Sequence, residues 1–388
     1  MISTNNQTMC LQKIIHKLTQ KPEIWPNGNF DSINYHLSGY PGDNLEKKYL
    51  YAKKVYEECL IGYQVSQLEV IAKFDEMLGL TGKRRHFNHS FEVFLLGLLI
   101  MNHKRNLFAK VWKEHGVTDK KVAWRKNFFT WLFTASFHDF GYPLEQSSKI
   151  IETIADMYFG IDVARVSDKF KMINTEKFLI TEDYLYKYYS LKNPSTLLGA
   201  KKYEMDVYDL EEILKNSFAM SLDEDSAEEY QQNKAKDKHG FVGALLLARQ
   251  TMGVTMDDSK DFNLESLMMA IGAVMVHSLP SKTEEKVSKD PYQGLVYSVN
   301  PKKNVFAYLL TLLDGLQDWD RNYGDSSDKY PEYTLNSFDF TGDTIALSFL
   351  VHCFTSESID PSIKFIADKK ALGKISKNFF NLKVRLEY

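Results

Sequence analysis

Several segments of this chain have the length of a helix and are apolar on almost every side. A helix on a protein surface keeps a polar face, so a helix that is apolar all round is expected in the interior. Such helices are predicted at 88–100, 124–139, 239–248, 264–276 and 304–319. Helices that are buried on all sides pack on one another. The sequence therefore predicts a mainly α fold with a helical bundle as its core.

Composition and charge narrow the classes of protein further. The 388 residues are 44% hydrophobic and 26% charged, which is ordinary for a soluble globular protein, and the length suggests two or three domains. The formal net charge of -3 provides no basic field for nucleic acid or for an anionic membrane. A membrane span needs a run of about 18 apolar residues, and the sequence contains none.

The cysteines and the N-terminus indicate the compartment. Cys10, Cys59 and Cys353 lie far apart and form no CxxC pattern, so neither a disulfide framework nor a thiolate zinc site is expected. The first residues lack the basic and then apolar layout of a signal peptide. We expect a cytoplasmic protein.

Three segments are predicted along the chain. Residues 1–45 form a weakly patterned N-terminal segment, with a short helix at 9–19 and then irregular structure. A helical domain follows at 46–322 and contains a long elaboration at 145–237. Further helices in this domain are expected at 44–77, within 103–121, at 145–158 and at 207–219.

The third segment, 331–388, is predicted to be a small α+β unit. Alternating apolar residues on both sides of a turn with glycine indicate a β-hairpin. Its strands are expected at 333–340 and 344–351, followed by a helix at 361–377 and a strand at 382–387.

Polar residues interrupt or end the apolar helices at six positions. A buried ionisable side chain is unfavourable unless it is paired or bound to a metal. A lone histidine on a buried helix is more often a satisfied core residue, but six such residues in one bundle would each need a partner. Facing helices build metal sites from residues of this kind. The six are His89, His138, Asp139, His239, His277 and Asp314.

The order of these residues resembles the HD superfamily of metal-dependent phosphohydrolases over about residues 80–322. The resemblance implies that His89, His138, Asp139 and Asp314 hold one divalent metal ion. It also implies that Asp139 bridges to a second ion, held by His239 and His277. Imidazole and carboxylate ligands suit manganese, iron, magnesium or zinc. The sequence departs from the family pattern at Tyr142, where many relatives have lysine, and at Ser278, where a further histidine is common.

Other residues are weaker candidates. The candidate catalytic residues are Asp139, as the bridging ligand, and Lys238 and Arg321. A cation beside the metals would stabilise charge on phosphoryl oxygens. Arg84, Arg85 and Tyr142 are candidate substrate-binding residues. The alternative for the two arginines is a solvated loop, and for Tyr142 it is simple packing.

The resemblance implies a metal-dependent phosphohydrolase or phosphodiesterase in which an activated water attacks a nucleotide-type phosphate ester or anhydride. The alternative is a catalytically inactive regulatory module that binds a metal and a nucleotide. A third alternative is a helical interaction protein whose histidines are structural. The expected partner is a small nucleotide, without membrane or nucleic acid, and the elaboration and the C-terminal unit could serve as regulatory or homo-oligomerising attachments.

Overall fold

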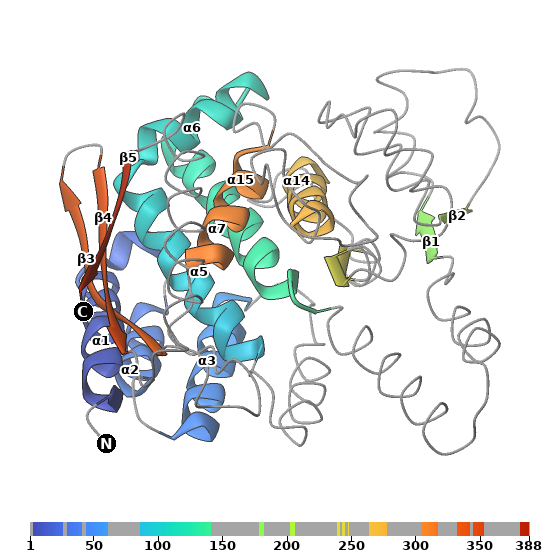
Figure 1. The fold of residues 1–388 in the computed structure, drawn as a ribbon. Coiled ribbons are helices and arrows are strands. Elements are labelled where there is room, and N and C mark those ends of the chain that lie inside the picture. Colours follow the sequence, from blue (N-terminus) through green and yellow to red (C-terminus); the bar gives the residue numbers. More distant parts are fainter. Residues whose placement is uncertain are drawn as a thin grey trace, which may run out of the picture. The chain divides into compact units, whose positions relative to one another are not determined.

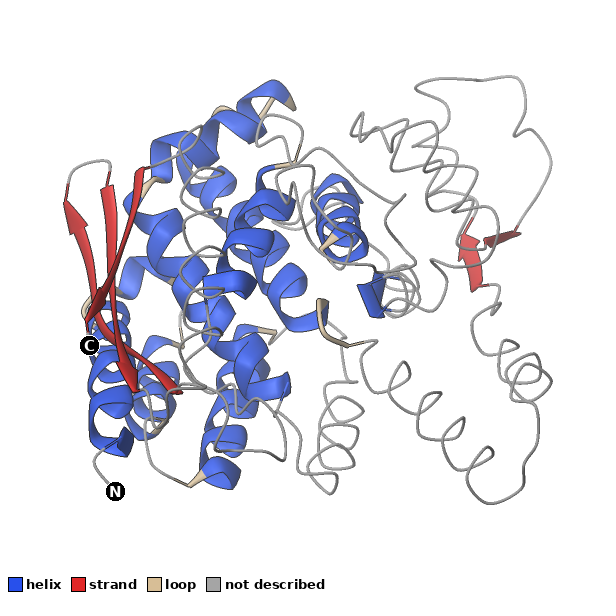
Figure 2. Cartoon of the chain, in the orientation of Figure 1, coloured by secondary structure: helices blue, strands red, loops and turns tan. Residues whose placement is uncertain are grey.

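The computed structural model describes the chain in separate segments, and helices predominate among them (Figures 1 and 2). The chain divides into two compact units, one of residues 1–120 with 308–388 and one of residues 121–307. No described helix combines the length and the hydropathy that crossing a membrane requires. The described residues are 3–25, 29–40, 44–60, 86–140, 178–181, 202–205, 239–240, 243–244, 247, 264–277, 304–316, 332–341, 344–352 and 381–387.

The first unit opens with α1 (Ser3–Thr19), the 3-10 helix η1 (Pro22–Ile24) and α2 (Phe30–Gly39). The predicted helix at 9–19 is therefore present but begins earlier. The prediction of irregular structure after it is wrong, because η1 and α2 follow. Only Ile33 and Leu37 of α2 are buried, one turn apart. So small an apolar face gives little periodic signal, and α2 depends on its packing against α3.

Helix α3 (Leu45–Cys59) begins where the sequence indicates. The Asn44 side chain accepts hydrogen bonds from the backbone N–H groups of Glu46 and Lys47 at 2.9 and 3.1 Å, which makes it an N-cap. The predicted helix at 44–77 is confirmed as far as Cys59, and its remainder lies outside the described residues.

Helix α5 (His86–His103) is the central helix of this unit. Every residue from Phe87 to Met101 is buried, as the sequence predicted for 88–100. Helices α1 and α3 pack on α5, and Tyr56 lies edge-on to Phe87 and Phe91. The next helix, α6 (Arg105–Glu114), confirms the surface helix expected within 103–121 and buries only Phe108 and Trp112.

The C-terminal strands form a three-stranded sheet in the order β3-β4-β5 (Figure 1). Strands β3 (Glu332–Thr341) and β4 (Thr344–His352) are antiparallel, which confirms the predicted hairpin, and β5 (Asn381–Glu387) is parallel to β4. A bulge in β3 leaves Asn336 as an extra residue between Leu335 and Ser337. Helix α1 contacts β3, so the two ends of the chain belong to one unit. The predicted helix at 361–377 lies outside the described residues.

The second unit contains α7 (Lys120–Phe137) from Lys121 on, and α14 (Leu264–Val276). Both helices confirm predicted segments, although α7 begins four residues earlier than the expected 124. Residues 239, 240, 243, 244 and 247 are helical, as expected for 239–248. A two-stranded antiparallel ladder of β1 (Phe178–Thr181) and β2 (Lys202–Met205) was not predicted, and the helices expected at 145–158 and 207–219 lie outside the described residues.

Helix α15 (Val305–Leu316) confirms the last predicted buried helix as far as Leu316. The boundary between the two units falls inside α15, after Ala307. The domain boundaries expected from the sequence, 1–45, 46–322 and 331–388, stay predictions.

Candidate metal centre

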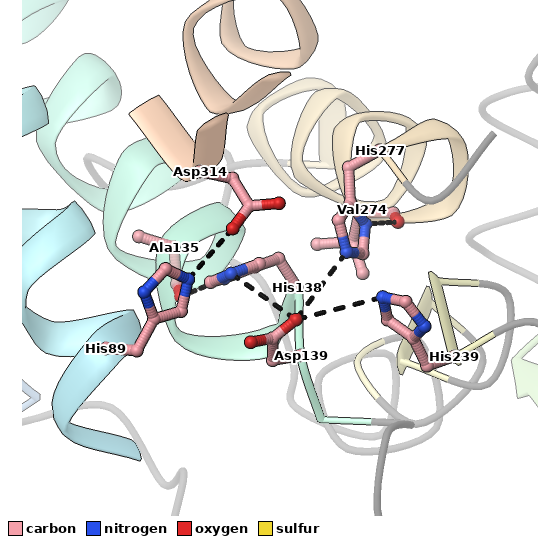
Figure 3. Close-up of polar contacts among 8 residues, drawn as sticks. All are labelled: His89, Ala135, His138, Asp139, His239, Val274, His277 and Asp314. Carbon is pink, nitrogen blue, oxygen red and sulfur yellow. Dashed lines mark hydrogen bonds and ion pairs between the residues drawn. The ribbon is translucent and has the colours of Figure 1, made fainter. Parts of the chain in front are cut away.

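Three of the candidate ligands follow the ends of two buried helices in the second unit. His138 and Asp139 come after α7, and His277 comes after α14. The last carbonyl groups of a helix have no intrahelical partner. In both cases the histidine Nδ1 lies close to one of them, at 2.8 Å from Ala135 O for His138 and at 2.6 Å from Val274 O for His277 (Figure 3).

These two contacts decide which ring nitrogen carries the proton. A carbonyl oxygen only accepts, so Nδ1 of His138 and Nδ1 of His277 must donate. In a neutral imidazole the other nitrogen, Nε2, is then a lone-pair acceptor. This is the tautomer in which histidine binds a metal ion through Nε2 while a carbonyl orients the ring.

The Nε2 atoms of three histidines surround one carboxylate oxygen. Asp139 Oδ1 lies 3.6 Å from Nε2 of His138, 3.8 Å from Nε2 of His239 and 3.9 Å from Nε2 of His277 (Figure 3). These distances are too long for hydrogen bonds. Two ligand atoms that each lie about 2.1 Å from one ion are roughly 3.4 Å apart at the tetrahedral angle and further apart at wider angles, so the spacing suits ligands of a shared cation.

The burial of these side chains favours a cation between them. The side chain of Asp139 is 8% exposed, and those of His138 and His277 are 0% and 1% exposed. A buried carboxylate that faces imidazole lone pairs would be repelled by them, whereas a cation between them attracts both. The ligand atoms of Asp139, His239 and His277 all lie within 4.8 Å of one another. The donor set therefore fits a divalent metal ion.

The other two candidate ligands meet in the first unit. Nε2 of His89 on α5 lies 2.9 Å from Oδ1 of Asp314 on α15, with side chains 2% and 27% exposed (Figure 3). The two residues are 225 positions apart in the chain. These two atoms lie within hydrogen-bond distance. The pair offers one imidazole and one carboxylate, the same donor types as the cluster in the second unit.

The five other candidates from the sequence are not tested by the structure. Lys238, Arg321, Arg84, Arg85 and Tyr142 all lie outside the described residues.

The sequence analysis missed a buried carboxylate in the first unit. Glu92 lies one turn after His89 on α5 and is 0% exposed. It accepts a hydrogen bond from Tyr40 Oη at 3.0 Å, and Lys48 Nζ lies 3.5 Å away. Its signal was available, because Glu92 is the one carboxylate inside the apolar segment 88–100. The reasoning that singled out Asp314 applies to it equally.

No family model matches this sequence, and comparison with curated proteins and with solved structures finds no similar protein. The class of protein is therefore defined here by its fold and its candidate site. This is a mainly helical protein with a small C-terminal sheet and a buried histidine and aspartate cluster that could bind a metal ion.

Proposed function

We propose that the protein is a metal-dependent phosphohydrolase or phosphodiesterase of the HD type that acts on a nucleotide-type phosphate ester or anhydride. The observation that carries the proposal is the group of three Nε2 atoms around Asp139 Oδ1, at 3.6 to 3.9 Å. Its support from the sequence is the order of the six ligands along the chain, which resembles that superfamily.

In this proposal the six residues hold two divalent ions. Asp139, His239 and His277 bind one, and His89, His138, Asp139 and Asp314 bind the other. When bound, divalent ions supply a lowered pKa for a coordinated water and positive charge beside the phosphoryl oxygens.

The protein's own contribution is to orient the ligand side chains and to shield them from solvent. The carbonyls of Ala135 and Val274 hold the rings of His138 and His277 in the metal-binding tautomer. The burial of Asp139 keeps bulk water from competing for its oxygens, which strengthens its interaction with any cation. Lys238 and Arg321 are proposed to stabilise charge on the phosphoryl group, and Arg84, Arg85 and Tyr142 to contact the substrate.

The metal is tested first, separately from catalysis. The metal content of the purified protein is measured by mass spectrometry for the wild type, Asp139→Asn and His277→Ala. His103→Ala is a matched control, because His103 is an exposed histidine at the end of α5. We expect about two ions per chain in the wild type and the control and a loss in the other two variants. Equal metal content in all four would overturn the metal centre.

Activity is then measured on a panel of nucleotides with added Mn²⁺, with Asp139→Asn beside the wild type. The panel contains cyclic mononucleotides and dinucleotides, deoxynucleoside triphosphates and guanosine polyphosphates. Hydrolysis of one member that is absent in the variant would support the enzyme and name its substrate class. A folded, metal-loaded protein that turns over none of them would favour the inactive regulatory module instead.

A further inference from the structure

Asn304 lies at the start of α15 and is 4% exposed. Its Oδ1 accepts hydrogen bonds from the backbone N–H groups of Phe306 and Ala307, at 3.1 and 3.0 Å. These groups belong to the first turn of α15, where backbone donors have no intrahelical partner. Asn304 is therefore the N-cap of the helix that carries Asp314.

The same side chain reaches a second helix. Nδ2 of Asn304 donates to the carbonyl oxygen of Met269, at 3.0 Å, in the middle of α14. Because N–H donors face Oδ1 and a carbonyl faces Nδ2, the orientation of the amide is determined by its partners. One buried side chain thus caps α15 and joins it to α14, and all of these contacts lie within the second unit.

Helix α14 leads to a candidate ligand of the same unit. His277 follows the end of α14 and lies eight residues after Met269. At 1.5 Å per residue this separation is about 12 Å, so a tilt of α14 by about 5° at Met269 would move its His277 end by roughly 1 Å. Metal–ligand distances tolerate only about 0.2 Å, so a displacement of that size at His277 would exceed what a bound ion allows.

We propose that Asn304 is a positioning residue of the metal centre, which holds α14 against the start of α15 so that His277 lies where a metal ion requires it. The inference rests on the proposed function, because it assumes that His277 is a ligand. Asn304 acts through the two helices and does not touch the metal or the substrate.

The side-chain chemistry limits what can replace asparagine. Serine can cap α15 but is too short to donate to Met269. Aspartate can cap α15 but has no donor, and its charge would face the Met269 carbonyl. The variants Asn304→Ser and Asn304→Asp therefore keep the cap and remove the contact between the helices.

Asn44 provides the matched control. It is the N-cap of α3, which carries none of the candidate ligands, and it is exposed. Asn44→Ala removes a cap and should lower the stability by about 1 kcal/mol without touching the metal centre. It reports what a loss of helix stability alone does to metal binding.

The experiment measures Mn²⁺ affinity by calorimetry on the full chain for the wild type, Asn304→Ser, Asn304→Asp, Asn44→Ala and Asp139→Asn, with urea unfolding of each. We expect Asn304→Ser and Asn304→Asp to bind Mn²⁺ about 10-fold more weakly or worse, while Asn44→Ala binds like the wild type. Urea midpoints of Asn304→Ser and Asn44→Ala should be similar.

Each contrary result has a distinct meaning. If the wild type binds Mn²⁺ and Asp139→Asn does not, but both Asn304 variants bind like Asn44→Ala, the positioning role is overturned and the metal centre stands. If the wild type binds no Mn²⁺, both proposals fall. If neither Asn304 variant folds, Asn304 is a requirement for folding, and the positioning role is overturned as well.

Discussion

Replacing Lys48 by methionine should destabilise the protein by about 3 kcal/mol, because it removes the ammonium group beside the buried Glu92 carboxylate. Breaking a buried ion pair from one side costs about 3–5 kcal/mol. Glu92 is fully buried, but the Lys48 side chain is 13% exposed and its Nζ lies 3.5 Å from the carboxylate, a long contact. Partial exposure and length both weaken the attraction, which places the expected loss at the lower end of the range.

The double variant Lys48→Met/Glu92→Leu separates this explanation from a simple loss of packing. Replacing both members of a buried pair by apolar residues is often neutral or stabilising, so the double variant should regain most of the stability that the single one loses. Lys53→Met is the control on the same helix. Its ion pair with Glu57 spans 3.9 Å between side chains 23% and 39% exposed, so its loss should cost less than about 1 kcal/mol.

The assay is urea unfolding followed by far-UV circular dichroism, with the slope of the transition compared among the variants. An unchanged slope with a shifted midpoint reports a change in stability alone. If Lys48→Met shifts the midpoint no more than Lys53→Met does, the interaction of Lys48 with Glu92 is not a stabilising buried pair. If the double variant is less stable than Lys48→Met, the buried charge of Glu92 is not what destabilises Lys48→Met. That result would also refute the reasoning.

Three further predictions concern single positions. Gly116 follows α6 with a φ of 80°, and no described atom lies within 4 Å of where its Cβ would be. Gly116→Ala should therefore lower the free energy of unfolding by about 1 kcal/mol through backbone strain alone. An unchanged urea midpoint would contradict this. A Cβ on Gly39 would lie 2.5 Å from Tyr51 Cζ, so Gly39→Ala should cost about 1–3 kcal/mol. Tyr51→Leu in the same chain should relieve most of that loss, and failure to do so would show that the ring is not the obstacle. Burial raises the pKa of the Cys59 thiol, with a smaller contribution from the charge of Glu58. In the unfolded chain the thiol ionises near pH ~8.5, so stability should fall as the pH rises above that value, by up to about 1.4 kcal/mol per unit, and Cys59→Ala should remove this part of the decline; equal slopes for both proteins between pH 9 and 10 would refute it.

The sequence by itself determined the elements whose signal is local. Apolar runs of helix length predict the helices α5, α7, α14 and α15. Alternating apolar and polar residues on both sides of a turn predict the β3–β4 hairpin. Each of these patterns can be recognised within one short segment of the sequence. The six candidate ligands were found for the same reason, since a histidine or aspartate stands out against an apolar helix.

Elements with a weak local signal could not be predicted. Helix α2 has only Ile33 and Leu37 as buried residues, and it forms because α3 is there to pack against. The β1–β2 ladder pairs two four-residue strands that carry too few residues for a periodic pattern. Glu92 was overlooked, and its contacts with Tyr40 and Lys48 in the tertiary structure show how a carboxylate can be fully buried in α5.

Only the tertiary structure decided how the ligands meet. His138 lies 101 positions before His239 and 139 positions before His277, yet the Nε2 atoms of all three face one oxygen of Asp139. No spacing in the sequence encodes that convergence, because it depends on how the helices that carry the residues pack. The ring tautomers likewise depend on where Ala135 O and Val274 O lie. The sequence determined which residues could bind a metal, and the packing decided which of their atoms face one another.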